Sequence, residues 1–350
     1  MKLEEGLIVG GIILIILGAF WLLLTYVPLQ VLIPLRPWIV IILGALSAFT
    51  GYLSGRTKGG VKLALSATYS SAAIIAFIVL LTAFIPPVIP FTPYTVSKPF
   101  SYSYTTEGVD TLELSIDFPN GDVVVRKADV NYINVTGRID IHVYLIGTYE
   151  EHFEEKVKPR VEVKREEGVL YLDVRSPSAG IPLWYTIEVE VLIPQGLKTT
   201  LRIDLTNGKV RVEGGYENVF VDVSNGEVDL DVDLDVLEVD LSNGMVSGRV
   251  SASKATIDLA NGEVSIRVPG DRSGEVTVDL TVGSIEVRAS PKAGYLIDAS
   301  TSVGSVDVNL GGVAESGRRL KLRTPNYDVA PVKVKLTLDV SVGSITVEEG

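Results

Sequence analysis

Hydrophobic and polar positions follow two different patterns along the chain, and the pattern changes near residue 100. Before that point, three uncharged runs rich in Ile and Leu cover residues 7–27, 38–53 and 63–85. An α-helix of about 20 apolar residues can cross the roughly 30 Å hydrocarbon core of a bilayer. Residues 1–85 are therefore predicted to form an α-helical membrane anchor with three spans, in contact with the lipid bilayer.

The charges around these runs predict the orientation of the anchor. The short loop between the second and third runs carries Arg56, Lys58 and Lys62, and positively charged loops stay in the cytoplasm. The N-terminus is then cytoplasmic and the residues after about 86 are extracytoplasmic, as in a multi-pass cell-membrane protein. A cleaved signal peptide is the alternative for the first run, but the acidic pair Glu4 and Glu5 and the two later runs argue against it.

Residues 86–104 differ from both neighbouring segments because they contain four closely spaced prolines. These are Pro86, Pro87, Pro90 and Pro93. Proline lacks a backbone donor and favours extended polyproline II geometry, so this segment is predicted to be a stiff stalk.

From Val109 onwards, apolar and polar residues alternate, and Val, Ile, Leu and Thr dominate. A period of two is typical of β-strands that bury one side. Charged stretches at residues 150–155 and 164–168 interrupt the alternation, so residues 105–200 are predicted to form a β cap or first sheet. Residues 201–350 are predicted to form a β-repeat array.

The array is predicted from an internal repeat that ends in glycine. The motif is an apolar residue, Asp, an apolar residue, Ser, Thr or Ala, then Asn or Val, and Gly. The corner glycines are Gly208, Gly226, Gly244, Gly262, Gly283, Gly304 and Gly343, spaced by 18 residues three times and then by 21, 21 and 39. The interval of 39 predicts one degenerate copy near residues 318–327.

Equal repeats can stack so that like positions lie about 4.8 Å apart, as in a β-solenoid or β-helix-like array. The alternative is an antiparallel meander or sandwich, because Asn-Gly is also the strongest two-residue hairpin signal. We favour the solenoid since it explains the constant period. Positive φ is predicted at Gly226 and Gly244, where the chain turns a corner.

Charge and composition exclude several classes of function. The whole chain has 31 Lys and Arg residues and 43 Asp and Glu residues. Residues 1–98 contain six of the basic residues and two of the acidic residues, so residues 99–350 carry a net charge of −16. Nucleic acid is therefore not an expected partner. With no Cys and only His142 and His152, thiolate and His-rich metal sites are also excluded.

Two stretches resemble a known family. They are Ile-Glu-Val-Glu-Val-Leu-Ile-Pro-Gln-Gly-Leu at residues 187–197 and Leu-Thr-Asn-Gly-Lys-Val-Arg-Val-Glu-Gly at residues 205–214. A strand ending in Pro and Gly, followed by repeated Ser/Thr-Asn-Gly corners, resembles the putative-adhesin family of extracytoplasmic β-strand repeats, a domain of unknown function. The resemblance covers about residues 105–350 and implies a surface role without catalytic residues. Some bacterial relatives belong to envelope-stress sensing proteins and follow membrane helices, an arrangement that resembles the layout predicted for this chain.

An aspartate that recurs four positions before the repeat glycine is the most regular candidate for binding. The set comprises Asp117, Asp204, Asp222, Asp240, Asp258, Asp279 and Asp339. Stacked carboxylates could bind a hard cation such as Ca²⁺, for which Asp222, Asp240 and Asp258 are the candidates. A solvated acidic face without a bound ion is the interpretation we favour, and no other cofactor is expected.

Polar side chains beside the glycines are further candidates. Stacked Asn207, Asn225, Asn243 and Asn261 could contact sugars, but such side chains more often bond to one another. Asn134 begins an Asn-Val-Thr glycosylation sequon.

These patterns together favour a membrane-anchored, adhesin-like scaffold that is not an enzyme. Every Asp of the set is explained by the repeat, and no additional acid or base accompanies it. Surface polysaccharide or envelope proteins are the expected partners, and the sequence defines no oligomeric state. The alternative function is an envelope sensor that acts through a membrane partner.

Overall fold

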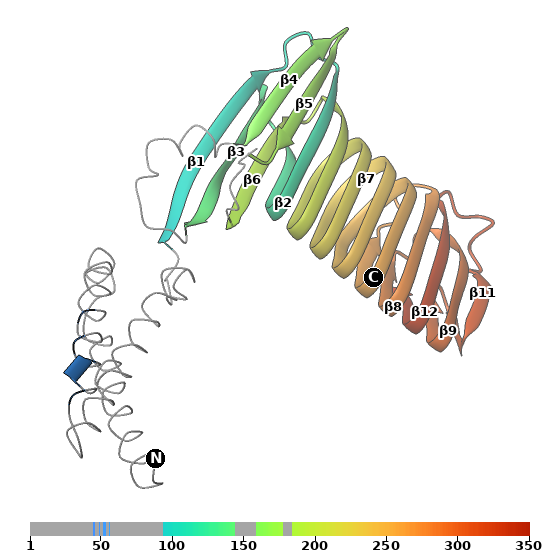
Figure 1. Cartoon of the computed structure of the whole chain (residues 1–350). Helices are drawn as coiled ribbons and strands as arrows, with labels where there is room; N and C mark the ends of the chain where they lie inside the picture. The colour runs from blue at the N-terminus through green and yellow to red at the C-terminus, as the bar shows by residue number, and fades with distance from the viewer. Residues whose placement is uncertain are drawn as a thin grey trace. The chain divides into compact units, whose positions relative to one another are not determined.

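The computed structural model describes residues 94–143, 159–177 and 184–350, together with Ala45, Phe49, Tyr52, Leu53 and Arg56 (Figure 1). The chain divides into two compact units, Met1–Thr92 and Pro93–Gly350. Each unit is described by itself. Residues 86–93 of the predicted stalk and the charged stretch at residues 150–155 lie outside the described residues.

The predicted three-span anchor is contradicted. In the first unit only the five residues named above are described, and they are helical. Within the described part of the chain, no helix combines the length and the apolar character needed for a membrane crossing. The apolar runs themselves lie largely outside the described residues. Run length and hydropathy are necessary for a span, but neither one specifies a continuous helix.

The multi-pass localisation was derived from these three spans and is contradicted with them. The cytoplasmic position of the N-terminus and the extracytoplasmic position of the residues after about 86 were both inferred from the number of predicted membrane spans. We do not carry this localisation further.

The second unit is built from β-strands. Their bounds are β1 Tyr94–Thr105, β2 Thr111–Ala128, β3 Tyr132–Val143, β4 Arg160–Glu166, β5 Val169–Arg175, β6 Trp184–Pro194, β7 Lys198–Val268, β8 Gly274–Ala289, β9 Gly294–Leu310, β10 Val313–Gly317, β11 Arg319–Arg323 and β12 Lys333–Glu349. β7 is 71 residues long because its extended backbone continues around successive corners of the array.

Parallel, in-register pairing stacks the repeats as coils. Gly121 of β2 lies opposite Gly208 of β7, and Gly262 of β7 lies opposite Gly283 of β8. The stacked-coil prediction agrees with this register, and an antiparallel meander or sandwich of the repeats does not. Pairing in register requires each coil to repeat the residue pattern of the last, which is why the 18-residue spacing was visible in the sequence.

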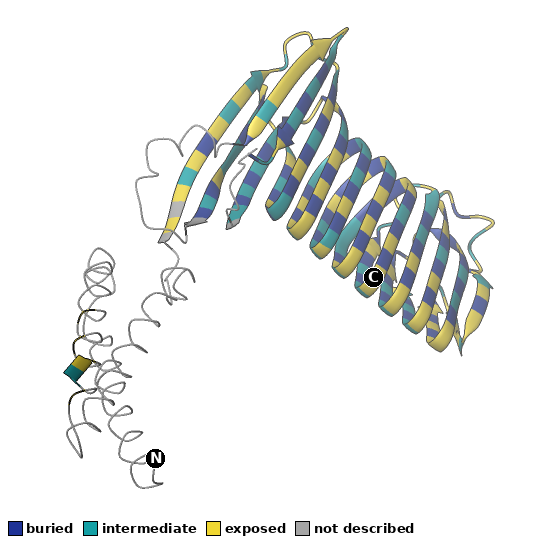
Figure 2. Cartoon of the chain, in the orientation of Figure 1, coloured by how far each residue is buried: buried dark blue, intermediate teal, exposed yellow. Residues whose placement is uncertain are grey.

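Burial alternates along both faces of every coil (Figure 2). Leu205 before the corner and Val210 after it are both almost fully buried, whereas Asp204 and Lys209 are exposed. The two faces of a flattened coil thus enclose one apolar core, and each face presents its own row of polar side chains to solvent. We call the face before the corner glycines face A and the face after them face B.

The N-terminal end of the array is closed by shorter strands. β5 pairs with the face A part of β2 and β6 pairs with its face B part, so together they take the place of one coil. β3 and β1 then extend the sheet antiparallel. β1 includes Tyr94–Thr105, where we expected the stalk, because its alternating aromatic residues Phe100, Tyr102 and Tyr104 pack on the core.

The C-terminal end does not follow chain order. β12 pairs in parallel with β8 on one side and with β9 on the other, so the last strand lies between two strands that precede it (Figure 1). β10 and β11 fold back antiparallel on the outer edge of β9. The prediction of a degenerate copy near residues 318–327 is therefore wrong, because β11 in this range is an antiparallel strand and not a coil of the array.

Candidate functional site

The repeated aspartates form one row across face A, which we call the aspartate ladder. Asp117 pairs in register with Asp204, Asp258 with Asp279, and Asp279 with Asp339. Asp222 and Asp240 occupy the coils between them on β7. All seven side chains are exposed. The spatial order follows the coils, so Asp339 neighbours Asp279 although 60 residues separate them.

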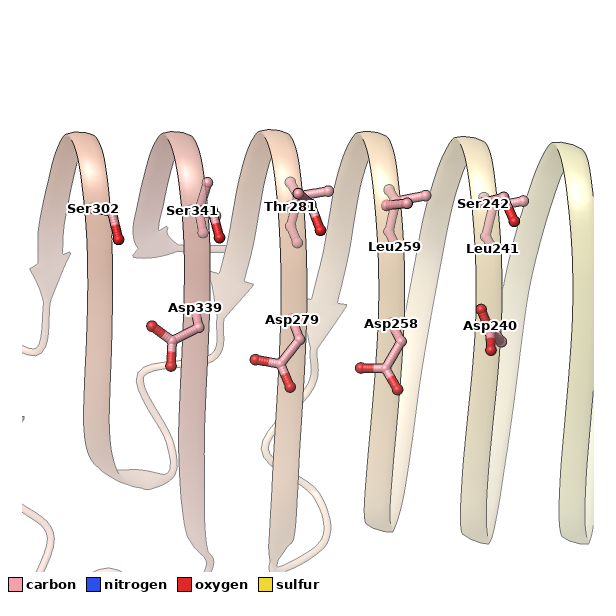
Figure 3. Close-up of a pocket in the computed structure, with 13 residues that line it drawn as sticks. Asp240, Leu241, Ser242, Asp258, Leu259, Asp279, Thr281, Ser302, Asp339 and Ser341 are labelled. Carbon is pink, nitrogen blue, oxygen red and sulfur yellow. The ribbon is translucent and has the colours of Figure 1, made fainter.

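A second row, of hydroxyl side chains, runs beside the aspartate ladder and was not identified from the sequence as a site. Ser242, Thr281, Ser341 and Ser302 lie two positions before their corner glycines and point to the same side as the aspartates (Figure 3). Aspartates 240, 258, 279 and 339 line with them an open groove of about 450 Å³. The signal was present in the sequence as the Ser or Thr that precedes Asn-Gly or Val-Gly.

The aspartates of the ladder are not compensated by cations, whereas several other carboxylates on both faces are. On face A, Lys335 Nζ lies 2.6 Å from Glu275 Oε1. Among the residues that the structure describes, no aspartate of the ladder forms an ion pair. On face B, Lys209 Nζ lies 2.8 Å from Glu227 Oε2 of the next coil. Arg249 lies 3.4 Å from Asp231 and 2.9 Å from Asp271. The unpaired carboxylates of face A therefore recur in one row, the aspartate ladder.

The ladder also perturbs the acidity of its own members. Partial burial and the neighbouring carboxylates of Asp204 and Asp240 raise the pKa of Asp222. The pKa of Asp258 is raised by partial burial and by Asp279 and Asp240, with a further contribution from Glu238. Partial burial and Asp339 raise the pKa of Asp279. Partial burial is the largest cause of each shift, and repulsion between like charges on adjacent strands adds to it.

The geometry gives no calcium site in the part of the chain that is described. No group of three or more His, Cys, Asp or Glu residues there converges closely enough to hold a metal ion. Each aspartate of the ladder has one like neighbour on each side in a straight row. A calcium ion takes six to eight oxygen ligands around one point, so a row of single carboxylates is a poor match for it.

The asparagines bond to one another, as we considered more probable than sugar contact. Asn207 Nδ2 donates to Asn120 Oδ1 at 2.9 Å, and the same bond recurs from Asn225 to Asn207 at 3.1 Å, from Asn243 to Asn225 at 3.0 Å and from Asn261 to Asn243 at 3.2 Å. In the next three coils this position is valine. Val282, Val342 and Val303 are 44, 46 and 59% exposed.

The corner glycines are required by close packing between coils. A Cβ atom added to Gly226 would overlap the carbonyl oxygen of Gly208, and a Cβ on Gly244 would overlap that of Gly226. Positive φ is observed at Gly244, at 144°, but Gly226 does not have it. The prediction of positive φ is therefore right for Gly244 and wrong for Gly226. Without side chains, these corners leave a second groove of about 780 Å³ beside Lys209 and Met245.

The remaining predicted positions lie apart from the aspartate ladder. Asn134 is half-buried in β3, between β1 and β6, and its Oδ1 accepts a hydrogen bond from Ser103 Oγ at 3.1 Å. Glycosylation sequons are expected on surface loops, and this asparagine lies within a paired strand. His142 also belongs to β3. His152 lies outside the described residues.

No protein-family model matches the chain, and no curated protein matches it. Several solved structures do. A putative cell adhesion protein from Clostridium sporogenes has 15% identity over 73% of this chain and 100% of its own, with a TM-score of 0.37. A putative adhesin from Parabacteroides distasonis has 14% identity over 74% of this chain and 98% of its own, with a TM-score of 0.33. A putative lipid binding protein from the same species has 13% identity over 72% and 97%, with a TM-score of 0.27.

The names of the first two structures coincide with the family that the sequence resembles. At these identities and TM-scores, we draw no conclusion about this chain from them. The function is inferred below from the geometry of the chain itself.

Proposed function

We propose that this chain is a non-catalytic, adhesin-like scaffold whose binding surface is face A. The observation that supports this proposal is that the aspartates of the ladder lack the cationic partners that other carboxylates of the array have. On face B, Glu227 has Lys209, and on face A itself Glu275 has Lys335. The carboxylates of the aspartate ladder have none among the described residues and repel one another instead.

Such a surface fits an extended partner that carries cationic groups at regular intervals. A partner cation placed between two carboxylates would relieve repulsion of the order of 1 kcal/mol per adjacent pair. The hydroxyls of Ser242, Thr281 and Ser341 beside the ladder would offer hydrogen bonds to the same partner. Because the aspartate recurs in seven coils, binding would depend on length and not on one residue. The sensor alternative required a membrane anchor and is not carried forward.

The proposal is tested with poly-L-lysine as the probe and the full chain as the protein. The triple variant Asp222→Asn, Asp240→Asn, Asp258→Asn should bind several-fold more weakly than the native chain. The matched control Glu227→Gln, Asp229→Asn, Glu263→Gln removes the same charge from face B and should bind almost normally. Equal losses in both variants would show that net charge alone attracts the probe. Equal binding of neutral dextran would also contradict the proposal.

A further inference from the structure

The last strand of the chain fills an internal position of the array. β12 pairs with β8 from Val334, opposite Gly274, to Glu349, opposite Ala289. Its other edge pairs with β9 from Lys333, opposite Gly294, to Glu348, opposite Asn309. Without β12, the facing edges of β8 and β9 would both be open. We call the space between them the β8–β9 slot.

The interior of the slot is complementary to one alternating apolar pattern. Six side chains of β12 enter the core and are at most 2% exposed, namely Val334, Leu336, Leu338, Val340, Ile345 and Val347. Gly343 lies between Gly283 and Gly304, where a Cβ would overlap a carbonyl oxygen. A strand that enters the slot therefore needs a glycine at the corner and apolar residues at fixed distances from it.

The walls of the slot are held by parts of the chain other than β12. The outer edge of β9 is covered antiparallel by β10 and β11, which follow it directly in sequence. Such local contacts form early in folding. Residues 290–293 connect β8 to β9 across the end of the slot. β12 follows these strands in sequence and pairs with the two edges that they leave open.

A nine-residue segment, 324–332, links β11 to β12 and can act as a hinge. It is fastened to the β8–β9 connection by Asn326, whose Nδ2 donates to Ala293 O at 3.0 Å and to Pro291 O at 3.4 Å. Arg323 also pairs with Asp328 inside this segment. Val329 at its outer side is 84% exposed. Thr324 N donates to Tyr295 O at 3.0 Å, Gly294 N donates to Val332 O at 2.9 Å, and Thr324 and Ala330 are buried. Opening the hinge costs all of these contacts, whereas the contacts of β12 itself are retained in any identical slot.

We propose that the β8–β9 slot also accepts β12 from a second copy of this chain, so that copies join by strand exchange. A partner's β12 is chemically identical, so every backbone hydrogen bond and apolar contact of the slot is reproduced. Exchange of an identical element is a low-cost route to assembly, and main-chain pairing on both edges supplies affinity as in strand addition generally. Reciprocal exchange closes a dimer, and one-way exchange extends an open chain of copies.

The chain has no cysteine, so engineered thiols report on the neighbour of β12 without interference. Ser344 of β12 lies opposite Ser284 of β8 and opposite Ser305 of β9. Full-length S344C is mixed with full-length S284C, both are unfolded, and they are refolded together at increasing concentration under mild oxidation. A second mixture uses S344C with S305C. S344C with S247C is the matched control, because Ser247 lies on face B of β7, away from the slot.

Strand exchange predicts disulfide-linked dimers in both slot mixtures, in several-fold excess over the S247C control and increasing with concentration. The double variant S284C/S344C, refolded when dilute, should close its disulfide within one chain, which verifies that β12 occupies the slot. Closure within one chain combined with dimers no more abundant than in the S247C control would overturn the proposal. Failure of both S284C/S344C and S305C/S344C to close would overturn it as well.

Discussion

At the scale of single residues, the corner glycines show that close approach matters more than backbone conformation. Gly244 has positive φ and Gly226 does not, yet both face the carbonyl oxygen of the preceding corner glycine. Strands in a sheet lie about 4.8 Å apart. A side chain that points along this direction has no room, whatever the φ of the residue that carries it.

This steric explanation predicts that Gly226→Ala destabilises the second unit by about 2 kcal/mol, within the range for overpacking. Gly196→Ala is the control, because a Cβ there has no neighbour within 4 Å. It should change the free energy of unfolding by about 0.5 kcal/mol or less. The measurement is urea unfolding of the full chain followed by far-ultraviolet circular dichroism. Equal stability of the two variants would mean that adjacent coils can move apart.

The aspartate ladder predicts an effect of pH with a definite sign. Because the pKa values of Asp258 and Asp279 are raised in the folded state, the folded chain binds protons more tightly than the unfolded chain. Their charges therefore reduce stability above the folded pKa, and this penalty disappears as pH falls toward the unfolded value. Asp258→Asn with Asp279→Asn should raise the free energy of unfolding at pH 7, by about 0.5 kcal/mol for each like-charged pair removed.

The gain should shrink to nearly nothing near pH 3, where the native carboxyls are protonated. The difference between variant and native chain is the quantity to follow, because other carboxylates act in the opposite direction. For Asp271, partial burial favours a higher pKa, but hydrogen bonds from Ser251 and Arg249 outweigh it and lower the pKa. A gain that persists unchanged at low pH would assign the effect of the two substitutions to packing rather than charge.

At the scale of elements, each coil adds one member to the polar rows of each face, and the aspartate ladder differs from the rows of face B in its charges. On face B, Lys209 and Arg249 alternate with carboxylates from coil to coil. In the ladder the same carboxylate recurs from β2 to β12 and is replaced by Ser300 in β9. A row of identical charges can be screened by any salt, while a cation site requires ligands arranged around one point.

We therefore expect calcium to stabilise the array only through screening. The melting temperature of the full chain should rise by similar amounts with CaCl₂ and with NaCl of matched ionic strength, both compared with chelator alone. A rise specific to calcium that disappears in the triple variant Asp222→Asn, Asp240→Asn, Asp258→Asn would contradict this expectation. It would instead identify bound ions between the coils.

At the scale of the whole molecule, the sequence was informative where one repeat determines the next. The spacing of Gly208, Gly226, Gly244 and Gly262 predicted stacked coils, and the shared Asp position predicted the ladder. The place of β12 could not be predicted in this way. The alternation of apolar and polar residues in β12 matches that of any other coil. The side-chain pattern alone is therefore compatible with β12 on either side of β9.

What decides the position of β12 is the antiparallel return of β10 and β11, which occupies the outer edge of β9. Sequence periodicity carries no information about such a reversal, because Arg319–Arg323 also alternates. The membrane anchor failed for a related reason. Hydropathy of residues 7–27 describes a preference for an apolar environment and does not specify the backbone conformation that satisfies it.

The internal position of β12 also makes the array depend on a strand that is synthesised after both of its neighbours. Strands are produced from the N-terminus, so β8 and β9 exist before the strand that joins them. A chain that stops before Lys333 would keep two open parallel edges, and unpaired edges are sites of aggregation. Residues 333–350 thus complete the array. Only a chain that contains this strand, or one that receives it from another copy, can pair the inner edges of both β8 and β9.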